Sequence, residues 1–217
     1  MTNLLDSLAV KYKTDKATQK VGRLAPKGYT LVYSKFFESI REAPMNILEI
    51  GVAEGASVKM WEEYFPNSTI YGIDINPACK KYESGRVKIR IGDQTDTTFL
   101  KSVCEEANNQ FGIIIDDGGH FMNQHIVSLE FLFDYVVSKG FYAIEDVHTC
   151  YSAQFGGGLQ KHDSSIEYLK TQIDFINVQN AEPVKASGRE NSDIMIHPIK
   201  NLESISFYKS VIMMTKS

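Results

Sequence analysis

The chain has 217 residues, 43% hydrophobic and 23% charged, which is the composition of one globular domain with a full core. Its net charge of -4 gives no electrostatic support for binding a nucleic acid or an anionic membrane. No apolar run approaches the roughly 18 residues that a membrane-spanning helix needs. We therefore expect a cytoplasmic protein whose partner is a small molecule or a glycan.

Strand-like and helix-like segments alternate in the middle of the chain. The pattern predicts strands at 45–52, 69–75, 86–93, 111–116 and 140–146, and helices at 57–65, 97–110 and 124–139. This alternation predicts an α/β fold with a mainly parallel sheet that is covered by helices on both faces.

The pattern changes after residue 151. Loops are expected at 154–160 and 180–193, on either side of a helix at 164–176. Two apolar runs near the end, 192–199 and 205–216, are expected to pair as strands at the end of the sheet, in an antiparallel arrangement.

Polar and glycine residues follow the first three predicted strands, where an open parallel sheet binds its ligands. Gly51 and Gly55 allow a tight turn and a close backbone approach to a ligand, although a plain turn explains them equally well. Their G-x-x-x-G spacing lacks the third glycine of nicotinamide sites. Asp74 suits a carboxylate that accepts hydrogen bonds from ribose hydroxyls, and Asp93 with Gln94 could contact an adenine edge or cap a turn.

Acidic residues and histidines crowd the ends of the next two predicted strands. These residues are Asp116, Asp117 and His120 after the strand at 111–116, and Glu145, Asp146 and His148 after the strand at 140–146. Crowded carboxylates repel unless a proton or cation separates them, so Asp117 and Asp146 are candidate ligands of a hard divalent metal. His120 is a candidate general base. The alternative is that the carboxylates bind loop amides and the histidines cap helices.

Several motifs, in this order, resemble the class I S-adenosylmethionine-dependent methyltransferases. They are "LEIGVAEGAS", "MWEEYFP", "IYGIDIN", "GDQTD", "IIIDDGGH" and "YAIEDVHTCY". Within that class, "GDQTD", "DDGGH" and "EDVHT" are similar to the metal-dependent sugar O-methyltransferases of the mycinamicin and macrocin type, as are "KYKTDK" and "YTLVYSKFF" nearer the N-terminus.

The resemblance implies a Rossmann-like seven-stranded sheet with an antiparallel last strand and a role for each candidate residue. It places Glu49, Gly51 and Gly55 around the methionine part of S-adenosylmethionine, Asp74 on its ribose, Asp93 and Gln94 near its adenine, and Asp116 in the wall of the cofactor pocket. It implies that Asp117 and Asp146 bind Mg²⁺ and that His120 accepts the proton of a sugar hydroxyl. Ser34 stands where relatives have an acidic residue, so a third protein ligand of the metal stays unassigned.

The resulting hypothesis is methyl transfer to a hydroxyl of a sugar or glycosylated small molecule, assisted by the metal. Methyl transfer to an amine or carboxylate is an alternative, and an NAD-linked sugar-modifying oxidoreductase is a weaker one. We expect one domain, 1–217, with an N-terminal segment at 1–44 and a core at 45–217. A homo-oligomer whose subunit contacts complete the site is compatible with this sequence.

The N-terminal stretch 11–28 is expected to cover the cofactor as a lid, with Lys11, Thr14 and Asp15 near the site. Among the other side chains, His125 is expected on a helix surface and Trp61 and Tyr142 in the core. Candidates for stacking on a sugar are Tyr29, Tyr33 and Tyr151.

Overall fold

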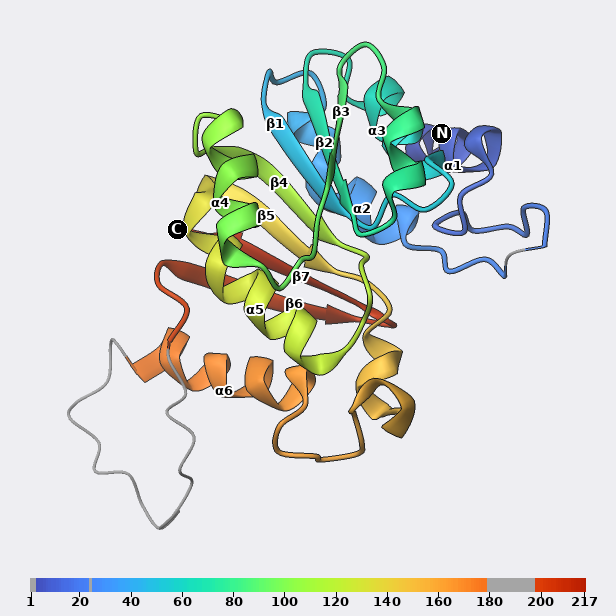
Figure 1. Cartoon of the computed structure of the whole chain (residues 1–217). Helices are drawn as coiled ribbons and strands as arrows, with labels where there is room; N and C mark the ends of the chain where they lie inside the picture. The colour runs from blue at the N-terminus through green and yellow to red at the C-terminus, as the bar shows by residue number, and fades with distance from the viewer. Residues whose placement is uncertain (1–2, 24, 179–197) are drawn as a thin grey trace, which may run out of the picture.

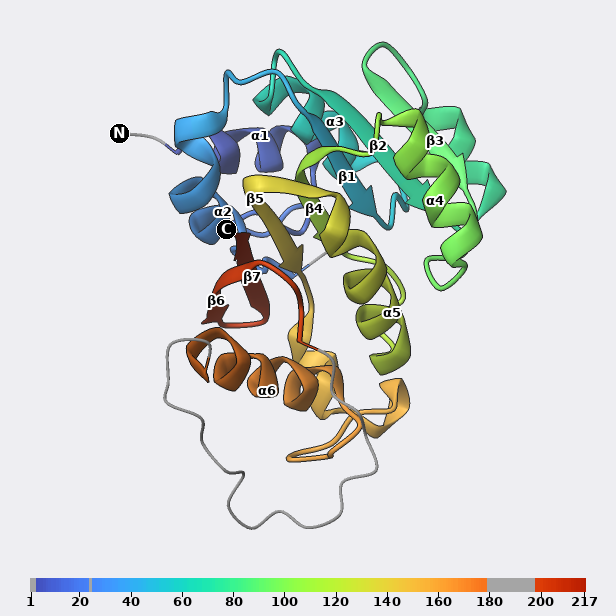
Figure 2. The ribbon, with the colours of Figure 1, turned by 90° about the vertical axis from the view of Figure 1, so that its left-hand side faces the viewer.

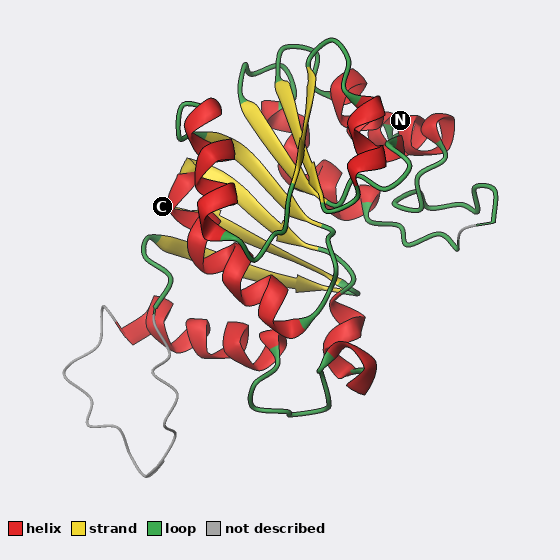
Figure 3. Ribbon diagram, viewed as in Figure 1, coloured by secondary structure: helices red, strands yellow, loops and turns green. Residues whose placement is uncertain are grey.

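A seven-stranded sheet forms the centre of the protein (Figures 1 and 3). The computed structural model describes residues 3–23, 25–178 and 198–217. The strands are β1 (Asn46–Ile50), β2 (Thr69–Asp74), β3 (Val87–Ile91), β4 (Phe111–Asp116), β5 (Val136–Ile144), β6 (Leu202–Tyr208) and β7 (Val211–Lys216). Their order is β3-β2-β1-β4-β5-β7-β6, and β7 runs antiparallel to both of its neighbours while the pairs from β3 to β5 are parallel. The predicted fold class is confirmed.

Helices cover both faces of this sheet (Figure 2). The α-helices are α1 (Leu4–Tyr12), α2 (Thr30–Phe37), α3 (Ala56–Tyr64), α4 (Thr97–Glu106), α5 (Met122–Leu132) and α6 (Ser165–Val178). Short 3₁₀ helices are η1 (Glu38–Ile40), η2 (Pro77–Tyr82), η3 (Phe133–Tyr135), η4 (Val147–Tyr151) and η5 (Ala153–Phe155). One buried cluster joins the sheet to α1, α2 and α3, and a second joins it to α4, α5 and α6.

The run of three isoleucines in β4 shows why these strands are apolar on both sides. Ile113 and Ile115 belong to the cluster under α1 to α3, whereas Ile114 belongs to the cluster under α4 to α6. Because side chains alternate along a strand, a strand covered on both faces carries apolar residues on both of its sides. The polar residues that follow β4 therefore lie at the edge of the core.

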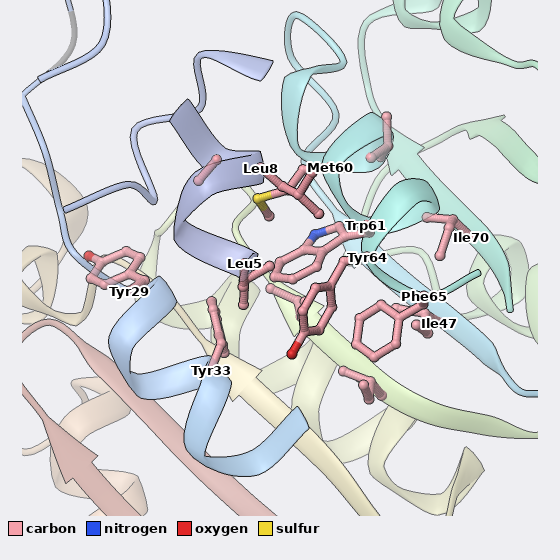
Figure 4. Packing of buried hydrophobic residues seen from close by; sticks show 14 of the residues in the cluster. Leu5, Leu8, Tyr29, Tyr33, Ile47, Met60, Trp61, Tyr64, Phe65 and Ile70 are labelled. Atoms are coloured by element: carbon pink, nitrogen blue, oxygen red, sulfur yellow. The ribbon is translucent and has the colours of Figure 1, made fainter. Parts of the chain in front are cut away.

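Aromatic side chains pack together with aliphatic ones where α1, α2 and α3 cover the sheet (Figure 4). Trp61 is fully buried, and its ring makes an edge-on contact with Tyr33 at a centroid distance of 5.6 Å. Tyr142 is also fully buried on the other side of the sheet. The core positions predicted for Trp61 and Tyr142 are confirmed.

Two predicted elements differ from the structure. The helix expected at 124–139 ends at Leu132, and β5 begins at Val136, because Val136 pairs with Phe111 of β4 and extends the sheet. The apolar run at 205–216 contains a turn at Lys209 and Ser210, so that β6 and β7 form a hairpin with each other. Most of the strand expected at 192–199, and the loop expected at 180–193, lie outside the described residues.

None of the described helices combines the length and the apolar character that crossing a membrane would require.

Candidate functional site

Backbone atoms of the loop after β1 lie directly against backbone atoms of the loop after β4. Gly51 has a φ of 92°, and a Cβ added there would lie 2.1 Å from the carbonyl oxygen of Asp117, so this position requires glycine. Gly51 donates its N–H to Ile73 at 2.8 Å, and Asp117 donates its N–H to Ile50 at 2.9 Å. The carboxyl ends of β1, β2 and β4 are thereby held at a fixed spacing.

A cavity of about 240 Å³ opens at these strand ends. Of the residues predicted to bind the cofactor, Gly51, Asp74, Asp93 and Gln94 line this cavity, and Asp117 lines it as well. Glu49, Gly55 and Asp116 are not among its lining residues. Gly55 has a φ of 72° and packs against the Tyr82 ring, and Glu49 and Asp116 are fully buried.

The Asp74 carboxylate is held by the backbone of the loops beside it. Its two oxygens accept N–H groups from Val52 at 2.9 Å, Ala53 at 3.0 Å and Asn76 at 2.8 Å. Partial burial acts to raise the pKa of Asp74, but these hydrogen bonds outweigh it, and the pKa lies below its usual value. Asp74 is therefore ionised at neutral pH and fixes the shape of the cavity wall.

The Gln94 side chain connects the cavity to the interior. Its amide nitrogen lies 3.2 Å from Asp116 and 2.9 Å from the Ser128 hydroxyl, and its amide oxygen accepts the N–H of Gly119 at 2.9 Å. Complete burial raises the pKa of Asp116 to about 7, although the Gly118 N–H and Gln94 act against this shift. Both polar groups of the Gln94 amide are thus already paired within the protein.

Two carboxylates and an imidazole converge at the ends of β4 and β5. Ligand atoms of Asp117, His120 and Asp146 all lie within 4.8 Å of one another. His120 Nε2 is 3.9 Å from Asp117 Oδ1 and 3.5 Å from Asp146 Oδ2. Carboxylate oxygens suit a hard divalent cation such as Mg²⁺, and an imidazole nitrogen is tolerated by several transition metals. The two carboxylates therefore fit a divalent cation, and His120 lies directly beside them.

Sequence reasoning missed a buried lysine, Lys16, that lies among the acidic cluster, which we define as Glu49, Asp117, Glu145 and Asp146. Lys16 Nζ lies 2.5 Å from Asp117 Oδ2, 2.7 Å from each oxygen of Glu145 and 3.6 Å from Glu49, and the side chain is 1% exposed. Burial opposes its charge, but the three carboxylates outweigh burial and raise the pKa of Lys16 well above its usual value. The only sequence signal for such a cation was the crowding of acidic residues at the ends of the predicted strands.

Two further side chains from the N-terminal segment hold Asp146. Lys27 Nζ lies 2.7 Å from Asp146 Oδ2 and 2.8 Å from Asp15, and the Tyr29 hydroxyl donates to Asp146 Oδ1 at 2.6 Å. Burial acts to lower the pKa of Lys27, but the surrounding carboxylates outweigh it and raise the pKa. Asp15 is therefore linked to the acidic cluster through Lys27.

Two expectations about the N-terminal segment are wrong. Lys11 does not reach the acidic cluster, because it pairs at the surface with Glu63 of α3. Tyr33 is fully buried and donates to Glu145 at 2.6 Å, so its ring is unavailable for stacking on a sugar. Tyr29 is also buried, at 2% exposure, whereas Tyr151 is 48% exposed.

The His120 ring is packed between the acidic cluster and the interior. Its centroid lies 6.4 Å from that of Phe155 and 6.1 Å from that of His125, and its Nδ1 is buried with no hydrogen-bond partner among the described residues. Burial lowers the pKa of His120, against the opposing effect of Asp117 and Asp146. Only Nε2 faces the carboxylates.

His125 is fully buried, which corrects the surface position predicted for it. Its Nδ1 lies 3.1 Å from the Ser165 hydroxyl at the start of α6, because α6 covers the face of α5 that the sequence pattern suggested was exposed. Burial lowers the pKa of His125 to about 3.

Comparisons with known proteins identify relatives of this chain. No protein-family model matches the chain. The chain is 32% identical over 187 residues to 8-demethyl-8-(2-methoxy-alpha-L-rhamnosyl)-tetracenomycin-C 3'-O-methyltransferase of Streptomyces olivaceus, a match that covers 80% of the chain and 47% of the relative. It is 34% identical over 188 residues to mycinamicin VI 2''-O-methyltransferase of Micromonospora griseorubida, with 80% and 46% covered. The chain thus spans about half the length of the curated relatives it matches.

The solved structures include the MycE methyltransferase of the mycinamycin biosynthetic pathway in complex with Mg and SAH. It superposes with a TM-score of 0.82 at 31% identity, over 98% of this chain and 54% of that one. A second MycE structure, which also contains mycinamycin VI, gives a TM-score of 0.81 at 30% identity, over 98% of this chain and 54% of that one. The resemblance seen in the sequence is confirmed, and the chain has the S-adenosylmethionine-dependent methyltransferase fold and is a homologue of the sugar O-methyltransferases of the mycinamicin and tetracenomycin type.

Proposed function

We propose that the protein transfers the methyl group of S-adenosylmethionine to a hydroxyl of a sugar or glycosylated small molecule, with the assistance of a divalent cation. The observation that carries this proposal is the group of Asp117, His120 and Asp146, of which Asp117 lines the 240 Å³ cavity, on a sheet of methyltransferase topology. The homology to sugar O-methyltransferases supports the same acceptor chemistry.

The cavity at the ends of β1, β2 and β3 is the proposed site of S-adenosylmethionine. Asp74 would accept hydrogen bonds from the ribose, and Asp93 and Gln94 would lie beside the adenine, because all three line the cavity. Glu49, Gly55 and Asp116 are proposed to shape the same site. Glu49 does so through the Ser57 hydroxyl at 2.7 Å and the Trp61 indole at 3.0 Å, which both donate to it.

Asp117 and Asp146 are proposed to hold Mg²⁺, which when bound would act as a Lewis acid and make an acceptor hydroxyl easier to deprotonate. Lys16, Lys27 and Tyr29 orient the two carboxylates through the contacts described above. Oxygen Oδ1 of Asp117 is the one that faces His120 rather than Lys16.

His120 is proposed to receive the proton of the acceptor hydroxyl at Nε2, the ring nitrogen that faces the carboxylates. A pKa lowered by burial keeps the imidazole neutral, and therefore able to accept a proton, near pH 7. The two carboxylates beside it then stabilise the imidazolium that forms. The stretch 11–28 of the N-terminal segment 1–44 is proposed to act as the lid. A homo-oligomer is also proposed, in which subunit contacts complete the site.

Calorimetric titration of the purified chain with S-adenosylhomocysteine, in Mg²⁺ and again in a chelator, tests the first half of this proposal. Binding under both conditions is the expected result, because the cavity wall shares only Asp117 with the group of Asp117, His120 and Asp146. Absence of binding under both conditions would overturn the assignment of the cavity and return it to the oxidoreductase alternative.

Methyl transfer from S-adenosylmethionine to a panel of glycosides tests the second half. His120→Ala is expected to lower the rate by about 10²–10⁴-fold while S-adenosylhomocysteine still binds. Asp117→Asn is expected to abolish most of the methyl-transfer activity. Added Mg²⁺ should no longer raise the rate that remains. Activity of the unaltered chain that is independent of metal would favour an amine or carboxylate acceptor instead.

A further inference from the structure

A second and larger cavity, of about 440 Å³, lies on the other side of the acidic cluster. Its wall includes Lys27 and Tyr29, the same two side chains that contact Asp146, and His148 of η4. The turn between β6 and β7 closes it, since Ser210 accepts the N–H of Val147 at 3.1 Å and its hydroxyl lies 2.6 Å from His148 Nδ1. Lys27 and Tyr29 therefore connect the wall of this cavity to the proposed metal ligand Asp146.

The charge of this wall is opposite to that of the whole chain. Three of its side chains, Lys27, His148 and Lys209, are basic, and no aspartate or glutamate lines the cavity. The chain as a whole carries a net charge of -4. Lys27 is balanced by Asp15 and Asp146, but Lys209 is exposed in the hairpin turn and pairs with no carboxylate among the described residues. The cavity thus has positive charge that no described acidic side chain neutralises.

Exposed aromatic rings supply the second feature of this wall. Tyr151 is 48% exposed and Phe207 is 42% exposed, and both line the cavity. Flat rings beside polar groups are suited to pack against the apolar face of a sugar ring or against a planar group. Aromatic faces together with an unbalanced positive charge fit a sugar that carries an anion.

We propose that this cavity binds the acceptor and that the acceptor sugar carries an anionic group, phosphate or carboxylate, which Lys209 and His148 contact. This inference rests on the proposed function, because it takes the hydroxyl beside Asp146 to be the one that is methylated. The sugar ring lies between Tyr151 and Phe207, and the anionic group lies toward the hairpin turn.

Titration calorimetry with three sugars tests the proposal, using the chain saturated with S-adenosylhomocysteine in Mg²⁺. The probes are glucose 1-phosphate, glucuronate and methyl glucoside, which share a ring and differ in charge. The test variant is Lys209→Glu. The matched control is Lys101→Glu, which reverses the charge of an exposed lysine on α4, away from the cavity. The expected result is tighter binding of the anionic sugars than of methyl glucoside, and a loss of about fivefold or more for the anions alone in Lys209→Glu.

The comparison of the two anionic sugars decides whether phosphate or carboxylate is the preferred group, and either result supports the proposal. Equal binding of all three sugars, absence of binding by both anions, or an equal effect of Lys209→Glu and Lys101→Glu overturns it. Binding of S-adenosylhomocysteine is measured separately in every variant. If S-adenosylhomocysteine binds but the sugar test fails, the proposal for this cavity is wrong. If S-adenosylhomocysteine does not bind to the unaltered chain, the proposed function is wrong.

Discussion

The carboxylates at the ends of β1 to β3 and those at the ends of β4 and β5 are held in different ways. Asp74 is fixed by backbone N–H groups of Asn76, two residues away, and of Val52 and Ala53, 22 and 21 residues away. Asp117 and Asp146 are fixed by side chains that lie 101 to 119 residues earlier in the chain. The half of the site at the ends of β1 to β3 can form within one β-α-β unit. The half at the ends of β4 and β5 needs the N-terminal segment to be in place.

This difference also separates the energetics of the two halves. Backbone hydrogen bonds to a partly exposed carboxylate each contribute modestly, and water can replace them. A buried ammonium among three carboxylates contributes little net stability as a group, but removing one member leaves charge that water cannot reach. Substitutions in the β4–β5 half should therefore have the larger effects.

Lys16→Met offers the strongest test of this comparison. Loss of the ammonium leaves the fully buried Glu145 and Glu49 and the partly buried Asp117 without a cation, so the free energy of unfolding should fall by about 3–5 kcal/mol in metal-free buffer. Urea denaturation followed by circular dichroism measures this change. Lys11→Met is the control, since its lysine pairs with Glu63 at the surface. Equal stability of the two variants would refute the view that Lys16 neutralises the cluster.

Asp74→Ala addresses the β1–β3 half. Three N–H groups lose their acceptor but remain near water, so the free energy of unfolding should fall by about 1–2 kcal/mol, less than for Lys16→Met. The same urea experiment measures it, and calorimetry with S-adenosylhomocysteine should show weaker binding. A loss larger than that of Lys16→Met would reverse the comparison between the halves.

His125→Gln sharpens the comparison through pH. Because burial lowers the pKa of His125 to about 3, the unfolded chain takes up a proton below about pH 6.5 that the folded protein does not. Stability should therefore fall as pH falls from 6.5 toward 3, by about 1.4 kcal/mol per pH unit from this group. His125→Gln should remove that part of the slope in urea denaturation at several pH values, and the exposed His162→Gln should keep it. Parallel slopes for wild type and His125→Gln would show that His125 is not the source.

Tyr29→Phe should have the smallest effect. It removes one hydroxyl that donates to Asp146 at 2.6 Å while Lys27 still holds that carboxylate, so about 1 kcal/mol of unfolding free energy should be lost. Thermal denaturation measures it, with Tyr12→Phe at the surface as the control. A change as large as that of Lys16→Met would mean that the hydroxyl, rather than the ammonium, supports the carboxylates.

The sequence predicted the parts of the fold that depend on local pattern. Strands β2 and β4 were placed within one residue of their observed bounds, because apolar runs flanked by polar turns have few other interpretations. Val136 was assigned to a helix because the apolar run around it satisfies both helical and strand periods, and only its pairing with Phe111 decides between them. Boundaries set by tertiary pairing lie beyond a periodicity argument.

In the candidate site as well, sequence reasoning brought together residues at neighbouring strand ends but missed those placed by tertiary packing. Asp117, His120 and Asp146 could be brought together from the sequence, since adjacent parallel strands end at one edge of a sheet. Lys16 could not, because a buried lysine and a solvated lysine look alike in sequence and its partners lie 101 and 129 residues away. His125 was misplaced for a related reason, since a helix between a sheet and a second helix is buried on two faces.

The contact between Gly51 and the Asp117 carbonyl has a consequence for how such a protein can diverge. It joins two backbones, so a change of the Asp117 side chain leaves the spacing of the two loops in place. The walls of the larger cavity, in contrast, consist largely of side chains from loops and a hairpin turn. In the proposed reaction, substitutions can therefore change the acceptor preference without changing the spacing of these two loops.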